Sequence, residues 1–187
     1  MTKFVELKIM QNRDCRRWLL NTSGDFTTKS AFNLIRHSKN ADKAFKLIWV
    51  AHILKKIYVF AWKLLCSSVP TDDRVQGCNI PLTSKCCCCA SPKTETLEHL
   101  FFEGDLANRV WSFFIQACDV AWFRIHTFKF VVKFWYRQAS KGSQKGLLLS
   151  AIPLFVVWEV WLERNRKKFE NCLGSAFNII FEVRRCV

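Results

Sequence analysis

An apolar periodicity between positions 56 and 67 is the feature that most constrains the fold of this chain. Five side chains recur at the i, i+3, i+4, i+7 and i+8 spacing that builds one face of an α-helix: Ile57, Phe60, Ala61, Leu64 and Leu65. The pattern ends before Pro70, because proline disfavours helical geometry in the preceding residue. Only 6 Gly and 4 Pro occur in 187 residues, and half of the residues are hydrophobic. A mainly α fold with a packed core is therefore predicted.

Weaker signals predict further elements along the chain. The hydroxyl groups of Thr27–Ser30 can cap a helix that continues to Ile35. Thr71 can cap a short helix, and the two carboxylates that follow it would lie at the positive end of the helix dipole. Apolar spacing predicts later helices over about 95–102, 106–117 and 147–170, the last bent at Pro153, and alternation predicts a short strand over 4–9.

The long C-terminal helix raises the question of what covers it. From Leu147 to Leu162 it is apolar on nearly every side, so it needs a partner surface in this chain or on another. Its longest apolar stretch, Gly146 to Trp158, is interrupted by Ser150 and Pro153 and falls short of the ~20 residues that cross a bilayer. We therefore expect no membrane partner. The N-terminus lacks the apolar core of a signal peptide, so an intracellular, reducing location is expected.

In such a compartment, clustered cysteines with a nearby histidine indicate a metal site before they indicate disulfides. Cys86 and Cys89 form a C-x2-C pair, whose turn lets two thiolates reach one zinc at ~2.3 Å. His99 lies on the predicted helix after this loop and can supply a third ligand. A closed structural zinc site has four ligands, and the next suitable position holds Gly104, which has no side chain.

Other interpretations of the same residues remain open at this point. The run of four cysteines can be an exposed reactive tract, and His99 can bond Glu95 or Glu103 across one helical turn. Another cysteine can also replace the missing ligand, although adjacent residues rarely point at one place. The candidates for that role are Cys78, Cys87 and Cys88.

The surrounding motifs resemble the zinc-binding domain that follows reverse transcriptase in plant non-LTR (LINE-type) retrotransposons, including its stand-alone or truncated copies. The resemblance runs in order from about Trp18 to Trp111. It is carried by GDFTTKSAF (24–32), IW (48–49), FAWKLL (60–65), VPTDDRV (69–75), the C-x2-C pair, ETLEHLFFE (95–103) and ANRVW (107–111). A further segment, WEVWLERNRKKF (158–169), is similar to one often found after that domain.

The resemblance implies a small helical zinc-binding module with a cysteine-containing loop, followed by a long C-terminal helix. It implies Zn²⁺ as the cofactor and Cys86, Cys89 and His99 as its ligands. The last ligand of the family pattern, in H-x4-C, falls on Gly104, so the site is one ligand short. The implied organisation is an N-terminal tail (1–23), the zinc-binding domain (24–120) and a basic, aromatic helical region (121–187).

The resemblance also implies a role in holding a nucleic-acid template, and the net charge of +14 is consistent with it. RNA or DNA is therefore the expected partner, bound without sequence preference. Candidate phosphate contacts are Lys55, Lys56, Lys63, Arg164, Arg166, Lys167 and Lys168. Aromatic and basic residues also alternate over 129–137, which is compatible either with base stacking or with a packed core and a solvated face.

No enzymatic activity and no small-molecule substrate are expected. Asp72-Asp73 follows Pro70 in a capping position rather than in a hairpin, and no spaced carboxylates suggest a ribonuclease H site. The histidines at 37, 52 and 126 have no nucleophile near them in sequence. Two hypotheses therefore compete: a zinc-dependent module that binds RNA or DNA, and a metal-free helical structural or interaction protein, a decayed retroelement remnant.

Overall fold

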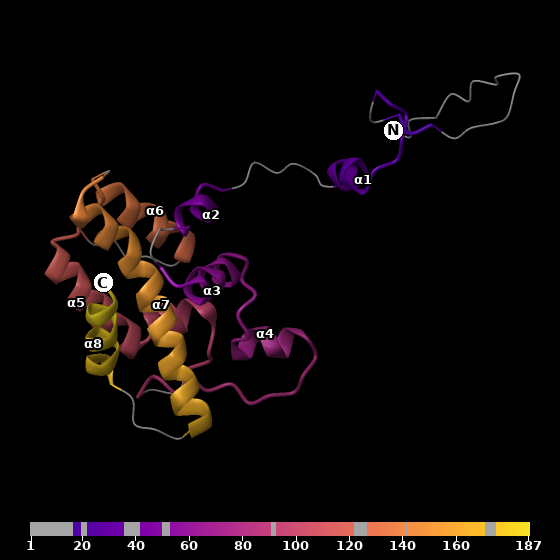
Figure 1. Ribbon diagram of the computed structural model, residues 1–187. Coiled ribbons are helices and arrows are strands. Elements are labelled where there is room, and N and C mark those ends of the chain that lie inside the picture. The colour runs from indigo at the N-terminus through magenta and orange to yellow at the C-terminus, as the bar shows by residue number, and fades with distance from the viewer. Residues whose placement is uncertain are drawn as a thin grey trace, which may run out of the picture. The chain divides into compact units, whose positions relative to one another are not determined.

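The apolar periodicities become helices in the structure, a computed structural model that describes residues 17–19, 22–35, 42–49, 53–90, 93–121, 127–140, 142–170 and 175–187 (Figure 1). No strand occurs among these residues, and the strand predicted over 4–9 lies outside them. The mainly α prediction is confirmed. The helices are α1 (Thr28–Ile35), α2 (Ala44–Leu47), α3 (Lys55–Leu65), α4 (Asp72–Gly77), the π-helix η1 (His99–Glu103), α5 (Asp105–Cys118), α6 (Phe128–Gln138), α7 (Gln144–Glu170) and α8 (Ala176–Cys186).

The chain divides into two compact units, residues 1–41 and residues 42–187. In the first unit, α1 begins as the sequence predicts, because the Thr27 hydroxyl oxygen accepts the backbone N–H of Ser30 at 3.1 Å. Trp18 and Phe26 make an edge-to-face contact, with ring centroids 5.0 Å apart. The second unit contains all the other helices and the cysteine loop.

The predicted α3 stripe is confirmed, since all five of its apolar residues are buried. The short helix after Pro70 is also present as α4, with Asp72 and Asp73 in its first turn. Its predicted cap is wrong in detail: the Thr71 hydroxyl donates to Asp73 Oδ1 at 2.6 Å and bonds no backbone N–H. The Thr71 side chain is thus bonded to the Asp73 carboxylate instead of the backbone, and α4 forms without this cap.

The long helix α7 is the centre of the second unit. It packs against α3, α5, α6, α8 and η1, so its apolar surface is covered within this chain (Figure 1). By length and composition α7 could cross a membrane, but 67% of its most apolar 18-residue window is buried inside the protein, as in a core helix. Leu147 and Leu148 remain exposed near its start.

Aromatic side chains connect α7 to the elements around the cysteine loop. Phe60 of α3 contacts Trp158 and Trp161 of α7, with ring centroids 5.5 and 5.8 Å apart. Phe101 of η1 lies 6.5 Å from Trp161. A continuous aromatic core therefore runs from α3 to η1 through α7, and it fixes η1 in place beside the loop.

Candidate metal centre

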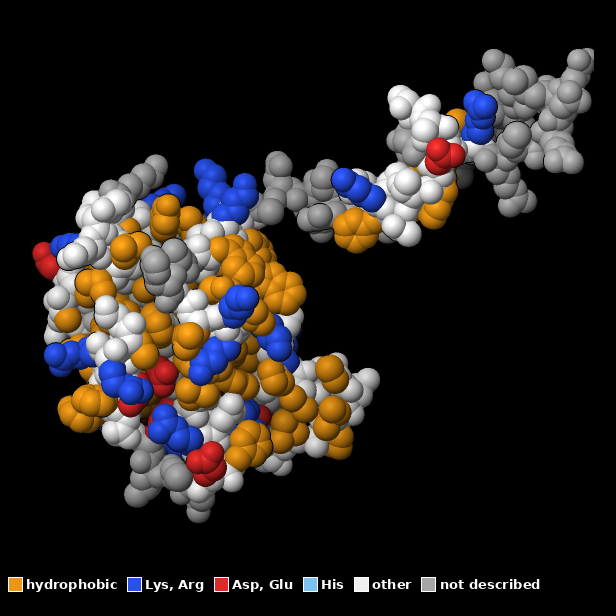
Figure 2. All heavy atoms as spheres, viewed as in Figure 1, with side chains coloured by type: hydrophobic (Ala, Val, Ile, Leu, Met, Phe, Trp, Pro, Cys, Tyr) orange, Lys and Arg blue, Asp and Glu red, His pale blue; other side chains and the backbone are white. Residues whose placement is uncertain are grey.

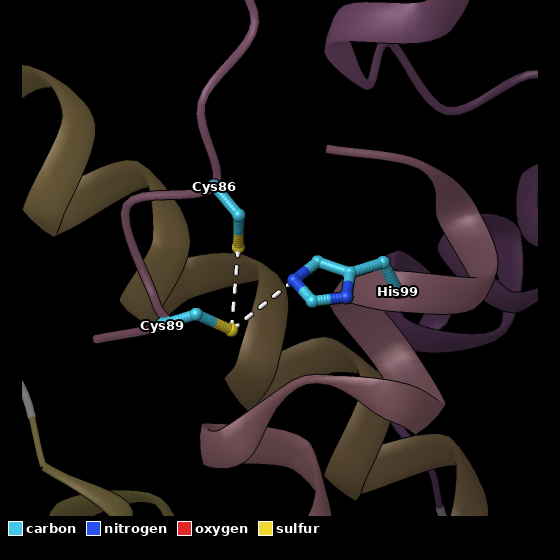
Figure 3. A group of neighbouring side chains, drawn as sticks. All are labelled: Cys86, Cys89 and His99. Atoms are coloured by element: carbon cyan, nitrogen blue, oxygen red, sulfur yellow. Dashed lines mark hydrogen bonds between the residues drawn. The ribbon is translucent and has the colours of Figure 1, made fainter. Parts of the chain in front are cut away.

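The cysteine pair is positioned by a tight turn between α4 and η1. The backbone N–H of Cys86 donates to the carbonyl of Lys93 at 2.8 Å, which closes the base of the loop. Cys87 and Cys88 form the turn, so the side chains of Cys86 and Cys89 come to lie on the same side (Figure 3). Cys86 is buried and Cys89 is half-buried.

His99 lies at the start of a π-helix rather than inside the α-helix predicted over 95–102. The backbone N–H of Gly104 donates to the His99 carbonyl at 2.7 Å, an i→i+5 bond. The backbone N–H of His99 itself donates to the Thr96 hydroxyl oxygen at 3.1 Å. Because a π-turn brings residues five apart onto nearly the same side, positions 99 and 104 both face the cysteine loop, which an α-helix would not achieve.

The three side chains converge on one point (Figure 3). One sulfur from each cysteine and a nitrogen of His99 all lie within 4.8 Å of one another. Two thiolates on one tetrahedral zinc at ~2.3 Å are about 3.8 Å apart, and the sulfurs of Cys86 and Cys89 are 3.8 Å apart. Cys89 Sγ and His99 Nε2 are 3.1 Å apart, close to the roughly 3.6 Å expected of two ligands on the same ion. The donor set and its spacing fit zinc.

Gly104 faces the same point. A Cβ atom built on Gly104 would lie 2.9 Å from Cys89 Sγ, 2.9 Å from the His99 carbonyl oxygen and 3.5 Å from His99 Nε2. Position 104 is therefore aimed into the cluster, but both 2.9 Å contacts are too short for a Cβ, so a side chain there requires Cys89 and the backbone of η1 to shift. The glycine leaves three protein ligands where a closed structural zinc site has four.

The thiols of the loop hydrogen-bond to one another, and this changes their acidity. A hydrogen bond from the Cys88 thiol lowers the pKa of Cys86 to about 6, and the nearby His99 contributes in the same direction. Burial raises the pKa of Cys89. Hydrogen bonding to the sulfurs of Cys86 and Cys87 holds the proton on Cys88 and raises the pKa of Cys88. A thiolate is the form that binds metal, so Cys86 is prepared for ligation near neutral pH.

None of the other cysteines considered from the sequence joins the cluster. Cys87 faces α7, where its thiol lies 3.7 Å from the Arg164 carbonyl oxygen. Cys88 lies beside Cys86 but outside the group of ligand atoms within 4.8 Å, and Cys78 is exposed after α4. His99 contacts Cys89 and not Glu95, because Glu95 is engaged elsewhere.

An ion-pair network holds the segment between the cysteine pair and His99 against α7. Arg164 Nη2 lies 2.5 Å from Glu95 Oε1 and 3.3 Å from Asp72 Oδ1, and all three side chains are at most 4% exposed. The Asp72 N–H also donates to the Glu95 carboxylate at 3.3 Å, and Lys168 pairs with Asp72. Sequence reasoning missed this network because it assigned Asp72 to a helix cap and Glu95 to His99.

The network corrects one of the predicted phosphate contacts. Arg164 is 3% exposed, and its guanidinium bonds Glu95 and Asp72 and lies 4.9 Å from the Trp161 ring, so it presents no free cation to a phosphate. Lys168 also has Asp72 as a partner, and Arg166 Nη2 lies 3.3 Å from a Glu163 oxygen. Nothing in the sequence spacing shows that Arg164 and Lys168 face carboxylates from distant segments, whereas the Arg166–Glu163 pair is local.

The remaining predicted contacts lie apart from the metal cluster. Lys55, Lys56 and Lys63 are exposed on α3, and the Lys56 ammonium lies 5.5 Å from the Trp158 ring. Lys167 is half-buried near the end of α7. On the face of residues 42–187 seen in Figure 2, Lys and Arg side chains are spread among hydrophobic ones. The histidines at 37, 52 and 126 lie outside the described residues.

The basic and aromatic segment over 129–137 lies on α6 and divides between core and surface. Trp135 is fully buried, whereas Phe130 is 47% exposed and stacks on Phe134. Lys133 pairs with Asp42 at 2.6 Å, and the Lys129 ammonium lies 5.9 Å from the Phe45 ring. Part of the alternation therefore serves packing against α2.

Comparison with known proteins agrees with this geometry. Residues 26–111 match the family model described as zinc-binding in reverse transcriptase. No curated protein and no solved structure matches the chain. The matched segment contains Cys86, Cys89, His99 and Gly104, and it ends within α5, before the long helix α7. Over residues 26–111 this chain is thus similar to an accessory zinc-binding domain of reverse transcriptase, not to a catalytic one.

Proposed function

We propose that this chain is a non-catalytic zinc-binding module of plant LINE-type retrotransposon origin, which holds one Zn²⁺ and binds RNA or DNA without sequence preference. The observation that carries the proposal is the cluster of Cys86, Cys89 and His99, whose ligand atoms lie within 4.8 Å of one another. A bound metal would tie the cysteine loop to η1, with a water molecule in the position that Gly104 leaves open. The match over residues 26–111 supports the same assignment.

The zinc half of the proposal is tested by native mass spectrometry of protein purified without added metal. We expect one zinc per chain, lost in His99→Ala and in Cys89→Ser. Cys66→Ser is the matched control, because Cys66 is an exposed free cysteine outside the cluster, and it should keep the metal. Zinc that survives His99→Ala, or that disappears equally in Cys66→Ser, would refute this ligand assignment.

The nucleic-acid half is supported by the net charge of +14 and by the exposed lysines of α3. Counterion release makes such binding fall steeply with salt. We therefore expect fluorescence anisotropy with labelled single-stranded RNA and DNA to show affinities that decrease linearly on a logarithmic salt scale. Weak, salt-insensitive association would remove nucleic-acid binding from the proposal.

Gly104 favours a second candidate function. A site with three protein ligands is weaker than one with four, and the ion-pair network and aromatic core hold the loop by other means. The alternative is a metal-free helical structural or interaction protein, a retroelement remnant that binds no nucleic acid. A folded wild-type protein without zinc would favour this alternative.

A further inference from the structure

A cavity beside the cysteine loop is lined by two positively charged side chains that are not part of the metal cluster. The ends of four segments enclose it: the cysteine loop, the start of α5, the end of α7 and the start of α8. Its volume is about 220 Å³. It is lined by Cys88, Ala90, Asp105, Leu106, Arg109, Lys167, Ser175 and Ala176.

The charges that face this cavity favour an anion. Arg109 and Lys167 both line it, and among the described residues neither has a carboxylate within ion-pair distance. Asp105 is the acidic residue in the lining, and its carboxylate accepts the backbone N–H of Ala90 at 3.3 Å. The lining therefore holds two cations and one anion, and the anion is already hydrogen-bonded. This contrasts with Arg164 and Lys168, whose charges are matched by carboxylates.

The hydrogen-bond donors around the cavity also suit a tetrahedral oxyanion. Arg109 supplies a planar fork of N–H groups and Lys167 a mobile ammonium. The Ser175 hydroxyl oxygen accepts the Asn178 N–H at 3.3 Å, which leaves the hydroxyl proton for another acceptor. Ala176 opens α8, and the first backbone N–H groups of a helix have no partner within it. These donors come from three separate helices and surround one space.

We propose that this cavity binds one phosphate group of a nucleic-acid backbone. The cavity is smaller than the roughly 300–1,000 Å³ of pockets that take drug-sized ligands, so it suits a single phosphate rather than a whole base. The net charge of +14 favours a polyanion that delivers this phosphate over a small monoanion. The site deepens the proposed function and rests on its nucleic-acid half, and it adds Arg109, which sequence reasoning did not select.

The test compares two double variants that remove equal charge. Arg109→Gln/Lys167→Gln removes the cations of the cavity, and Lys43→Gln/Lys46→Gln removes two exposed lysines at α2, which are not among the candidate phosphate contacts. Binding of a labelled single-stranded oligonucleotide is followed by anisotropy over a salt series, with circular dichroism and zinc content checked for each protein. We expect the cavity variant to lose at least about tenfold in affinity and about one unit of salt slope. The Lys43→Gln/Lys46→Gln control should lose about threefold or less.

Equal losses in the two variants would overturn the proposal, because they would show that only the overall field of the protein matters. The proposal would also be overturned if the cavity variant bound as tightly as the wild type.

A second arm separates this site from nucleic-acid binding in general. Inorganic phosphate is titrated into isotopically labelled wild-type protein, and the backbone amide signals of Ala90, Arg109, Ser175 and Ala176 are followed by NMR. Shifts at these amides that are lost in Arg109→Gln/Lys167→Gln would support phosphate binding in the cavity. If the oligonucleotide then fails to bind, only the nucleic-acid function is refuted. If phosphate leaves these amide signals unshifted while the oligonucleotide still binds, the phosphate site in the cavity is refuted and the nucleic-acid function stands.

Discussion

The cysteine loop and the residues that follow it take part in two polar clusters, which differ in completeness. The ion-pair cluster sets two cations, Arg164 and Lys168, against the two buried carboxylates of Asp72 and Glu95. The metal cluster has two sulfurs and one imidazole, with a glycine where a fourth ligand would point. The same loop is thus held by one complete set of interactions and one incomplete set. The comparison predicts that loss of the ion pairs destabilises the fold more than the absence of a metal does.

The largest expected effect comes from breaking the complete cluster. Arg164→Ala leaves Glu95 and Asp72 buried without their shared guanidinium, and loss of one partner from a buried pair costs about 3–5 kcal/mol. Urea denaturation should show this loss in the free energy of unfolding, with or without zinc. Arg185→Ala is the control, because Arg185 forms an exposed pair with Glu182 and should change little. A similar small change in Arg164→Ala would contradict the comparison.

The next effect comes from completing the incomplete cluster. Gly104→Cys places a thiol at the position aimed at Cys89 and His99, and we expect its zinc affinity to exceed that of Gly104→Ala by at least about tenfold. Competition with a chromophoric chelator measures this affinity. Gly104→Ala is the matched control, since it adds the same Cβ, 2.9 Å from Cys89 Sγ, without a ligand atom and should weaken zinc binding. Equal affinities in the two variants would show that position 104 does not reach the metal.

A third effect is expected in the metal-free protein as the pH changes. The pKa of Cys86 is lowered from 9.0 to about 6 in the folded chain, so folding favours the thiolate. The stabilisation is therefore present above pH 9, declines as the pH falls from 9 to 6 and is lost below 6. Thermal unfolding with a chelator present should show the Tm rising from pH 6 to 9, and Cys86→Ser should flatten this rise. A Tm that falls over this range in the wild type and not in the variant would show that ionisation of Cys86 destabilises the folded protein.

The smallest effect concerns Glu159, a buried acid of α7 that lies outside the ion-pair cluster. Burial raises the pKa of Glu159, and the nearby Glu182 adds to this shift. A raised carboxyl pKa destabilises the folded protein as the pH rises above the ordinary value of 4.5. Glu159→Gln should therefore raise the Tm slightly at pH 7 and leave it unchanged at pH 4. A gain of equal size at both pH values would point to packing instead of charge.

The sequence predicted the parts of this molecule that depend on local pattern. The stripe from Ile57 to Leu65 identified the buried face of α3, and the C-x2-C pair with His99 identified the metal cluster, because each pattern maps directly onto a helix or a turn. The π-turn at His99 was not predicted, since its i→i+5 bond leaves no periodic signature in five residues. The H-x4 spacing to position 104 is the one signal that could have indicated it.

Long-range pairing was not predictable from one sequence. Asp72, Glu95 and Arg164 lie up to 92 residues apart, and each has an ordinary local role as a cap, a helix residue or a surface cation. The convergence of Arg109 and Lys167 on one cavity is of the same kind. Such contacts follow from how α7 crosses the other helices, which depends on the whole core.

The position of Arg164 has a practical consequence for anyone who expresses part of this protein. The match ends at residue 111, but Arg164 and Lys168, the cations that pair with Glu95 and Asp72, lie on α7, more than fifty residues later. A fragment trimmed to the match would carry every metal ligand, yet it would expose an apolar surface and two carboxylates that nothing balances. The boundary at which sequence similarity ends and the boundary of what can fold independently are therefore expected to be different places on this chain.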